Sequence, residues 1–280
     1  MSLRNSSKKP KGLGRQTIAF IGGGNMGEAL IRGLLAAQTV APRQLTVADV
    51  QTARLRYLAE AVGVRTMTDN RKAVSNADIV LLAVKPQQMR EVLSDLRPLP
   101  SALFVSIAAG VTTASIEQGL GGKARVVRVM PNTPALVRAG AAALAKGRFA
   151  TNNDLAIAEA ILGAVGVTVR VEERLFNAVT ALSGSGPAYV FLLAEAMIKA
   201  GVDAGLSADI AKKLTLQTIF GAAKLMLDSG LEPAELRRKV TSPGGTTEAA
   251  MKVMAERNLP ETFSKAVAAA ARRGWELSGA

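Results

Sequence analysis

The sequence contains neither cysteine nor histidine, and these two absences exclude more chemistry than any other feature of the composition. Without cysteine the chain forms no disulfide, no thiolate nucleophile and no zinc site with sulfur ligands. Without histidine it lacks the commonest general base and every Ser-His-Asp arrangement. Any chemistry must therefore be performed by a bound cofactor, carboxylates, hydroxyls, lysines or backbone amides. No metal site is expected.

Aromatic residues and long apolar segments are also scarce. Only 4% of the 280 residues are aromatic although 49% are hydrophobic, so the core must be built from Ala, Val, Leu and Ile. No apolar run approaches the roughly 20 residues that a membrane-spanning helix needs, and residues 1–16 lack the apolar segment of a secretion signal. We therefore expect a soluble, cytoplasmic protein without a membrane partner.

Acidic residues are outnumbered, and the net charge is +13. Residues 1–16 carry five bases and no acid, which predicts a disordered basic tail. The remaining excess of positive charge is dispersed, without a basic run or interleaved aromatic residues. The sequence therefore gives no support to nucleic-acid binding, and a general attraction for small anionic ligands is the expected consequence.

From residue 17 onward, short apolar runs alternate with helical segments such as 28–37, 52–62 and 88–96. The runs are almost continuously apolar, as are strands buried on both faces of a sheet. The alternation predicts an α/β fold with a parallel, doubly wound sheet over residues 17–171. The expected strands are 17–21, 45–49, 79–84, 103–108, 125–130, 140–144 and 167–171.

The first expected strand leads directly into the sequence GGGNMG at 22–27, and a helix follows. In this position Gly22 permits a tight turn, Gly24 lets the backbone approach a pyrophosphate, and Gly27 lets the helix pack on the strand. The phosphates would face the free amides at the helix N-terminus. The motif predicts dinucleotide binding; the alternative is a glycine-rich turn without a ligand.

The second expected strand ends at Asp49, where a carboxylate can bind the ribose hydroxyls of the cofactor and repel a 2′-phosphate. This favours NADH. Arg54 and Arg56 follow within about one helical turn, either to neutralise a phosphate or to form a solvated helix face. The residues alone leave the choice between NADH and NADPH open.

The second half is helical almost throughout, and its apolar segment 188–227 has few polar faces. Such helices must be buried, but about 110 residues provide little interior, so a second copy of the chain is the expected cover. This predicts a homodimer; the alternative is a lone helical bundle. The expected helices are 173–182, 188–204, 208–227, 234–240, 247–257 and 261–274.

Two glycine-rich segments, SGSGP at 183–187 and TSPGGTT at 241–247, each precede an expected helix. Both place amides and hydroxyls at a helix N-terminus, which suits a carboxylate or a phosphate. Either segment is also explained as an ordinary capped turn. The second is the richer in glycine and hydroxyl groups and is therefore the better candidate for a site.

Six motifs together resemble the pyrroline-5-carboxylate reductases, in chain order from about residue 17 to about residue 275. The last two are the specific ones, whereas the glycine loop fits any Rossmann dehydrogenase. The motifs are IGGGNMG at 21–27, AVKPQ at 83–87, SIAAGV at 106–111, RVMPNTP at 128–134, LSGSGPAY at 182–189 and TSPGGTT at 241–247.

The resemblance implies a Rossmann domain at 17–171 and an all-α dimerisation domain at 172–280, with dimers that can assemble further. It implies reduction of Δ1-pyrroline-5-carboxylate to L-proline by NADPH or NADH, the last step of proline biosynthesis. The implied substrate contacts are Glu173, Gly245, Thr246 and Thr247. The implied cofactor contacts are Ile21, Gly22, Gly23, Gly24, Asn25, Met26, Asp49, Asn70, Ala83, Val84, Lys85, Pro86, Ala108, Ala109 and Lys239.

Two positions depart from the resemblance. Some relatives have a small hydroxyl residue where this chain has Asp49, so the cofactor preference here can differ. Some have an asparagine that touches the cofactor where this chain has Lys239, and a lysine there either holds a phosphate or points to water.

The implied reaction needs no histidine, because an iminium carbon accepts hydride without a strong base. The amides of Gly245, Thr246 and Thr247 are expected to bind the substrate carboxylate. Thr247 is the predicted catalytic residue: its hydroxyl would bond the ring nitrogen, mainly to orient it, and the proton source stays open. Lys85 and Glu173 are expected to position groups rather than act as acids.

Three other functions stay open at this point. The chain could reduce a related cyclic imine, or it could bind dinucleotides as a sensor without catalysis. A 3-hydroxyacid dehydrogenase has the same order of domains, but the position of its catalytic lysine is Val190 here, and the helix supplies no lysine before Lys199.

Overall fold

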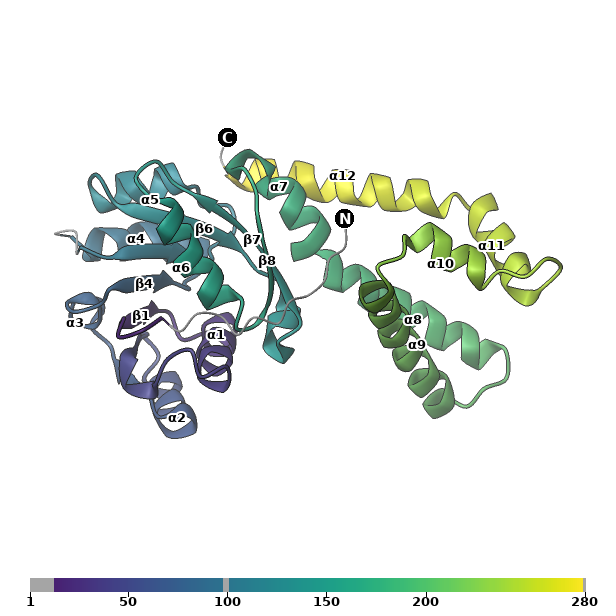
Figure 1. Cartoon of the computed structure of the whole chain (residues 1–280), viewed down its shortest axis with the longest axis horizontal. Helices are drawn as coiled ribbons and strands as arrows, with labels where there is room; N and C mark the ends of the chain where they lie inside the picture. Colours follow the sequence, from purple (N-terminus) through teal and green to yellow (C-terminus); the bar gives the residue numbers. More distant parts are fainter. Residues whose placement is uncertain (1–12, 98–100, 279–280) are drawn as a thin grey trace. The chain divides into compact units, whose positions relative to one another are not determined.

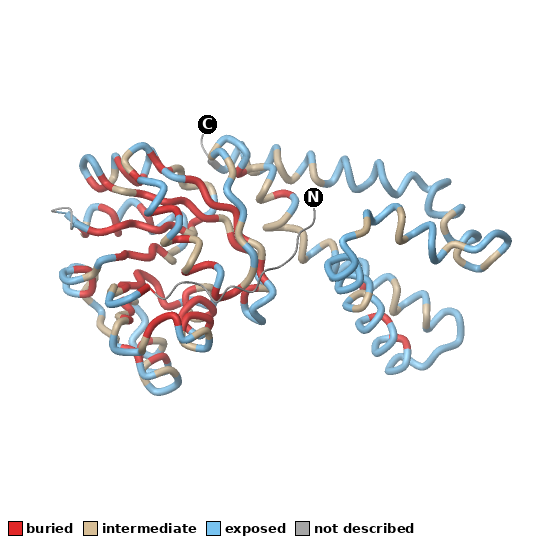
Figure 2. Tube along the Cα trace, viewed as in Figure 1, coloured by how far each residue is buried: buried red, intermediate tan, exposed pale blue. Residues whose placement is uncertain are grey.

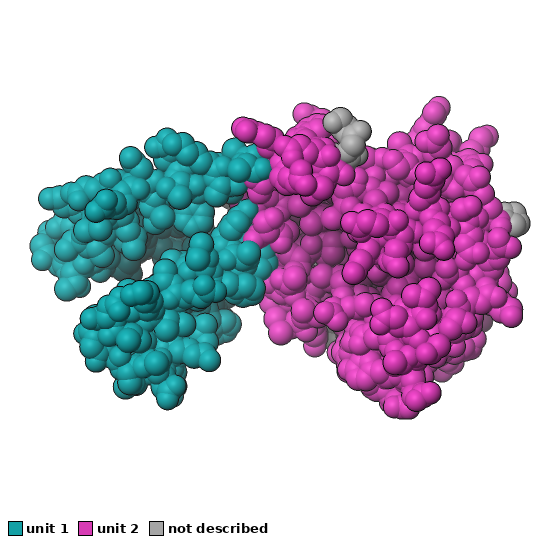
Figure 3. All heavy atoms as spheres, turned by 180° about the vertical axis from the view of Figure 1, so that it is seen from behind, with its two compact units in different colours: residues 1–7, 186–269 teal, residues 8–185, 270–280 magenta. Residues whose placement is uncertain are grey.

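The computed structural model describes residues 13–97 and 101–278, which form two compact units. The sheet unit ends at Ser185 and also takes in the C-terminal residues from Ala270; the helical unit runs from Gly186 to Ala269. Figure 3 colours the two units. Most of the predicted basic tail, residues 1–12, lies outside the described residues, whereas Leu13 is already buried in the core of the sheet unit.

An eight-stranded sheet forms the centre of the sheet unit, in the order β3-β2-β1-β4-β5-β6-β7-β8 (Figure 1). All neighbouring strands are parallel except β6 and β7. The crossover between β1 and β4 is the topological switch point, where ligands of such folds bind. The strands are β1 Ile18–Ile21, β2 Leu45–Ala48, β3 Arg65–Met67, β4 Ile79–Leu82, β5 Leu103–Ser106, β6 Arg125–Met130, β7 Gly140–Lys146 and β8 Gly166–Arg170.

These strands confirm the predicted doubly wound fold and all seven predicted strands, and they add β3. Alternate residues of β1 face opposite layers: Ile18 and Phe20 pack in one cluster, Ala19 and Ile21 in the other. The first cluster lies under α1, α2 and α6, the second under α3, α4 and α5. The helices are α1 Asn25–Ala36, α2 Thr52–Val62, α3 Asn70–Val74, α4 Met89–Asp95, α5 Thr113–Leu120 and α6 Asn152–Leu162.

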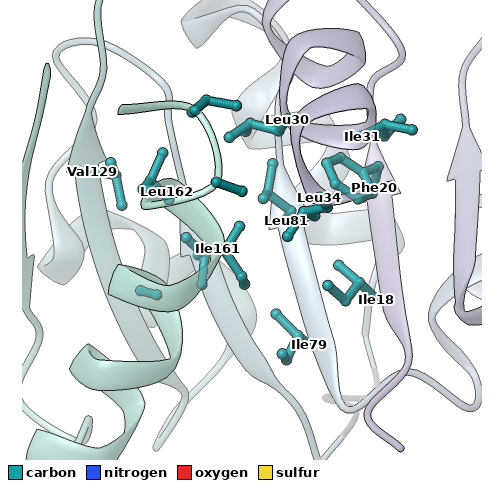
Figure 4. Packing of buried hydrophobic residues seen from close by; sticks show 14 of the residues in the cluster. Ile18, Phe20, Leu30, Ile31, Leu34, Ile79, Leu81, Val129, Ile161 and Leu162 are labelled. Carbon is teal, nitrogen blue, oxygen red and sulfur yellow. The ribbon is translucent and has the colours of Figure 1, made fainter. Parts of the chain in front are cut away.

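The larger cluster is closed by apolar faces of α1 and α6 (Figure 4). Leu30 and Leu34 of α1 and Ile161 of α6 are fully buried against the strands. Burial of each such side chain contributes about 1.5–3 kcal/mol. The core therefore fixes β1, and with it the glycine loop that follows. Short 3-10 helices connect some elements: η1 Pro42–Gln44, η2 Pro86–Gln88, η3 Thr133–Val137 and η4 Glu173–Leu175.

A helical run begins at η4 and continues through α7 Phe176–Val179, a π-helix η5 Thr180–Gly184 and α8 Gly186–Asp203. It is the one helix in the described part of the chain that is long and apolar enough to cross a membrane, by length and composition alone. This corrects the expectation that no segment reaches that length. One such helix is weak evidence for a membrane, because an apolar helix covered by another protein copy passes the same test.

The helical unit continues after α8 with α9 Ala208–Ser229, α10 Pro233–Lys239, α11 Thr246–Glu256 and α12 Leu259–Ser278, whose last residues belong to the sheet unit. Only Ala194, Ala211 and Thr215 are buried between Gly186 and Ala269. Figure 2 shows the same contrast, with buried residues concentrated in the strands. Among the exposed apolar side chains are Phe191, Leu192, Leu214, Leu216, Phe220 and Leu227.

Candidate dinucleotide and carboxylate sites

The glycine loop connects β1 to α1 and is shaped by close backbone approaches. Gly22 has a φ of +102°, and a Cβ there would lie 2.6 Å from the Ala83 carbonyl oxygen. A Cβ on Gly27 would lie 2.8 Å from the Gly22 oxygen. Gly24, the N-cap of α1, has no heavy atom within 4 Å of its Cβ position. The loop is therefore packed at both ends and open at Gly24, where a phosphate can approach.

A cleft of about 880 Å³ lies beside the glycine loop. It is bordered by the ends of β1, β2 and β4, which come together because β1 pairs with both neighbours in register. Its lining also contains residues that the sequence did not single out, among them Gln51, Arg71 and Arg90. The predicted cofactor residues that line it are Ile21, Gly22, Gly24, Asp49, Asn70, Ala83, Val84 and Lys85.

The other predicted cofactor residues have different places. Gly23 lies within the glycine loop, Asn25 and Met26 begin α1, and Pro86 begins η2 directly after Lys85. Ala108 and Ala109 follow β5; Ala108 is buried and Ala109 is exposed. Lys239 is the last residue of α10 in the helical unit, and its Nζ lies 3.2 Å from Glu235.

The Asp49 side chain directly follows β2 and is half-buried. Both of its carboxylate oxygens accept hydrogen bonds from backbone amides. Oδ2 accepts a hydrogen bond from the Gly23 amide at 2.7 Å, and Oδ1 accepts one from the Gln51 amide at 2.9 Å. Asp49 therefore ties β2 to the glycine loop while its charge lines the cleft. A carboxylate at this position opposes a 2′-phosphate by charge repulsion.

Arg54 does not extend into the cleft. Its Nε donates to the Gly23 carbonyl at 2.5 Å, and its Nη2 pairs with Glu28. Glu28 also accepts hydrogen bonds from Arg32 at 2.6 Å and from the Tyr57 hydroxyl at 3.0 Å. Burial opposes ionisation of Glu28, but these hydrogen bonds outweigh it and lower the pKa of the carboxyl below its ordinary value.

Glu173 is held inside the sheet unit by three hydrogen bonds. Oε1 accepts from the Thr113 amide at 2.8 Å and from Arg128 Nη1 at 3.0 Å, and Oε2 accepts from the Thr113 hydroxyl at 2.6 Å. The buried Arg128 guanidinium also lies 4.4 Å from the centre of the Phe176 ring. Glu173 thus joins η4 to β6 and to the first turn of α5, just after the turn that contains Ala108 and Ala109.

The SGSGP segment spans the end of the π-helix and the first residues of α8 rather than a simple capped turn. Asn132 donates from Nδ2 to the backbone oxygen and the hydroxyl of Ser183, both at 3.3 Å. A Cβ on Gly184 would lie 2.6 Å from Met130 Cε. The segment therefore packs against the RVMPNTP motif. Single π turns of this kind are frequent at functional sites.

The TSPGGTT segment forms the entrance to α11 in the helical unit. Gly244 has a φ of +69°, and its amide donates to Glu248 Oε2 at 2.8 Å. Gly245 is the N-cap with no side-chain capping bond, and its amide donates to the Ser242 carbonyl at 3.0 Å. Thr246 and Thr247 occupy the first turn, where amides have no partner within the helix. This arrangement can bind a carboxylate.

The structure thus groups the predicted residues into two sets. Most predicted cofactor residues and Glu173 belong to the sheet unit, whereas Lys239 and the TSPGGTT segment with Gly245, Thr246 and Thr247 belong to the helical unit. Sequence reasoning missed the Glu28 pairing with Arg54. The i,i+4 spacing of Glu28 and Arg32 was a visible signal, but the contact with Arg54 spans 26 residues and is tertiary.

Models of two families match the chain. The family described as pyrroline-5-carboxylate reductase dimerisation matches residues 173–277, and the family described as NADP oxidoreductase, coenzyme F420-dependent, matches residues 17–110. The dimerisation match confirms the predicted class of the helical domain.

Curated relatives match along almost the whole chain. The pyrroline-5-carboxylate reductase of Pseudomonas aeruginosa is 46% identical over 264 residues, covering 93% of this chain and 96% of the relative. The reductase of Methanosarcina acetivorans is 44% identical, covering 94% and 98%. These matches span both units.

Solved structures agree with the sequence relatives. The pyrroline-5-carboxylate reductase of Coxiella burnetii has a TM-score of 0.90 at 43% identity, and that of Plasmodium falciparum, with NADP bound, has 0.84 at 30% identity. Each match covers 94% of this chain and 98% of the solved chain. The chain belongs to the pyrroline-5-carboxylate reductase family.

Proposed function

We propose that the protein reduces Δ1-pyrroline-5-carboxylate to L-proline with NADH or NADPH, as the last step of proline biosynthesis. The observation that carries the proposal is the 46% identity to a pyrroline-5-carboxylate reductase over 93% of the chain. A match of this extent includes both the glycine loop and the TSPGGTT segment. A dehydrogenase of another kind would share only the first of these.

The sheet unit fits a dinucleotide. Gly24 leaves space that any Cβ would occupy, the cleft beside it holds about 880 Å³, and α1 directs its first amides toward it. A nicotinamide dinucleotide would supply the hydride when bound. Ile21 to Met26 would hold its pyrophosphate, Asp49 its ribose, and Ala108 and Ala109 the edge of its nicotinamide.

The helical unit fits the substrate carboxylate. The amides of Thr246 and Thr247 in the first turn of α11 would bind it, favoured by the positive end of the helix dipole, whereas the Gly245 amide already donates to the Ser242 carbonyl. The Thr247 hydroxyl would bond the ring nitrogen and orient the imine carbon toward the hydride. Hydride adds to that carbon, and one proton ends on nitrogen, so the product is a secondary amine.

Three further residues would support binding without taking part in the chemical step. Glu173, whose carboxylate is bound by Thr113 and Arg128, would hold the first turn of α5 behind the nicotinamide edge. Lys85 and Lys239 would attract the anionic cofactor, since long-range attraction needs no fixed contact. A direct contact of Glu173 with the substrate stays a prediction from the family resemblance.

We propose that two copies of the helical unit cover each other's exposed apolar side chains in a homodimer. The dimerisation match over residues 173–277 and the exposure of residues such as Phe220 support this. Assembly of dimers into larger oligomers, a cytoplasmic location and the lack of membrane or nucleic-acid partners stay predictions from the sequence.

Two substitutions at Thr247 test the function. The absorbance of reduced nicotinamide is followed with pyrroline-5-carboxylate, and proline is identified as the product. Thr247→Ala is expected to lower kcat/KM by about 10–100-fold through loss of one hydrogen bond in the transition state. Thr247→Ser keeps a hydroxyl and is expected to retain most of the activity.

Two results would count against this proposal. Unaltered protein that binds NADH but never oxidises it with the imine would identify a sensor rather than an enzyme. A Thr247→Ala variant with an unchanged rate and KM would remove Thr247 from the site.

A further inference from the structure

Both peptide groups of Gly23 are held by side chains from the segment that follows β2. Its amide donates to Asp49 Oδ2 at 2.7 Å, and its carbonyl accepts from Arg54 Nε at 2.5 Å. The middle glycine of the loop is thereby fixed from both sides. One side chain of this pair is anionic and lines the cleft, whereas the other is cationic and does not line it.

Arg54 is kept away from the cleft by a second anchor. Its Nη2 pairs with Glu28 of α1, and the two side chains are only 22% and 16% exposed. The Tyr57 ring lies 5.1 Å from the guanidinium carbon, and its hydroxyl donates to Glu28 at 3.0 Å. Arg32 completes the group by donating to both Glu28 and Tyr57. A partly buried carboxylate with three donors holds a guanidinium firmly.

This arrangement determines which charge the ribose end of the cleft presents. Asp49, Val50 and Gln51 line it at the end of β2, and Asp49 is the charged residue among these three, whereas Arg71, Lys85 and Arg90 line the cleft from other segments. Arg54 lies one turn further, in the first turn of α2, which is where an arginine accommodates a 2′-phosphate in NADP-binding folds. Its Nε donates to Gly23 and its Nη2 to Glu28, which holds the guanidinium on that side of the loop, and Arg56 is exposed on the same helix.

We infer that Glu28 is a specificity-determining residue for the cofactor: by pairing with Arg54 it withholds that guanidinium from a 2′-phosphate, and it thereby favours NADH over NADPH. The inference rests on the dinucleotide-binding part of the proposed function, not on imine reduction. Glu28 acts through Arg54, at the far side of the glycine loop, without touching the ribose.

Two nucleotides that differ only in the 2′-phosphate test the inference without any catalysis. The dissociation constants of AMP and adenosine 2′,5′-bisphosphate are measured by calorimetry. For the unaltered protein AMP is expected to bind at least as tightly as the bisphosphate. Glu28→Ala frees Arg54, and the preference is expected to shift toward the bisphosphate by about tenfold, the value of one charge-assisted hydrogen bond.

Three further variants make the result specific. Glu28→Gln keeps an acceptor for Arg54 but loses the charge, so an intermediate shift is expected. In the double variant Glu28→Ala with Arg54→Met the shift must disappear, because no guanidinium remains. Glu60→Ala removes the same charge from the exposed side of α2, and the ratio is expected to stay unchanged.

Folding of each variant is checked by circular dichroism, and Glu28→Gln serves if Glu28→Ala does not fold. An unchanged nucleotide ratio in folded Glu28 variants would overturn the inference, as would a shift that persists without Arg54. If the unaltered protein bound neither nucleotide, the dinucleotide site and its specificity would both be wrong. If it bound both but reduced no imine, only the proposed reaction would fail.

Discussion

The two units of this chain have similar hydrophobic material but bury it differently. In the sheet unit the central strands β1, β4 and β5 are buried on both faces, and residues such as Phe20 and Phe104 are fully inaccessible. In the helical unit only Ala194, Ala211 and Thr215 are buried between Gly186 and Ala269. The first unit buries most of its large apolar side chains within one chain, although Val167 and Val169 of β8 are exposed. The second leaves exposed a surface far richer in large apolar side chains than a monomer normally shows, which is typical of an interface.

The polar contacts of the two units differ in the same way. In the sheet unit they join distant segments: Glu173 with Thr113 and Arg128, and Asp49 with Gly23. In the helical unit the described ion pairs all join residues four apart on one helix, such as Lys199 with Asp203. Such exposed pairs contribute about 0.3–0.5 kcal/mol each and cannot hold helices together. Tertiary order in this unit must come from apolar contacts.

The strongest test of this contrast is a charge on the exposed surface of α9. Phe220 is 61% exposed in one chain, and Phe220→Glu would bury a carboxylate wherever a second copy covers it. We expect the dissociation constant of the dimer to rise by about 1,000-fold, or about 4 kcal/mol. Sedimentation velocity measures it.

A matched control comes from the sheet unit. Val137 is 76% exposed there, and Val137→Glu is expected to leave both assembly and stability unchanged within about 0.5 kcal/mol. If both substitutions raised the dissociation constant of the dimer equally, the proposed difference between the two units would be wrong.

The glycine loop offers the next largest effect and separates folding from binding. Gly22→Ala forces a Cβ to 2.6 Å from the Ala83 oxygen at a φ of +102°, so we expect about 2 kcal/mol of destabilisation in urea unfolding. Gly24→Ala has space in the free protein, so its stability is expected to change by less than about 0.5 kcal/mol. NADH fluorescence titration should nevertheless show binding weakened by about tenfold or more. Equal stability of the two variants would contradict this assignment of the two glycines.

The Glu173 cluster tests whether long-range polar contacts stabilise the sheet unit. Glu173→Gln leaves the Arg128 guanidinium, 6% exposed, without its anionic partner. A loss of about 2 kcal/mol in unfolding free energy is expected. Glu172→Gln is the control, since Glu172 is 68% exposed and pairs only with the exposed Arg174. A rise in KM for the imine without loss of stability would instead assign Glu173 to the substrate.

The smallest expected effect is a pH dependence from Glu28. Its pKa in the folded protein lies below the ordinary carboxyl value of 4.5, so the ionised form favours folding. This contribution is complete above about pH 4.5 and is lost as the pH falls through the lower folded value. In Glu28→Gln the free energy of unfolding should therefore fall less between neutral and acidic pH than in the unaltered protein, by about 1 kcal/mol or less. If the free energy of unfolding fell equally at acidic pH in both proteins, the hydrogen bonds assigned to the ionised Glu28 would be contradicted.

Much of the fold could be predicted because buried parallel strands have a clear pattern. All seven predicted strands are present, and the glycine loop lies where β1 leads into α1. β3 was missed because its three residues, Arg65–Met67, form a short edge strand without an apolar run. The predicted helix over 173–182 proved to be a 3-10 turn, one α turn and part of a π-helix. The contact of Gly184 with Met130 at the end of that π-helix is tertiary, and no local pattern contains it.

The candidate site could be predicted only in part, for a similar reason. Local motifs indicated Gly22 and Asp49 and the family resemblance implied Thr247, and the roles of all three stay predictions. The contacts that Asp49 and Arg54 make with Gly23 span 26 and 31 residues, and no local pattern contains them. The sequence left open whether Arg54 neutralises a phosphate or lies on a solvated helix face, whereas the structure directs it to the Gly23 carbonyl and to Glu28.

One measurement tests most directly the claim that the helical unit is covered by a second copy. Sedimentation equilibrium of the intact protein, followed over a wide range of concentration, gives its mass in solution. The account predicts a mass of at least twice the 29.1 kDa of one chain, in even multiples. A stable, folded monomer at every concentration would contradict it, because the exposed side chains of α8 and α9 would then have no cover.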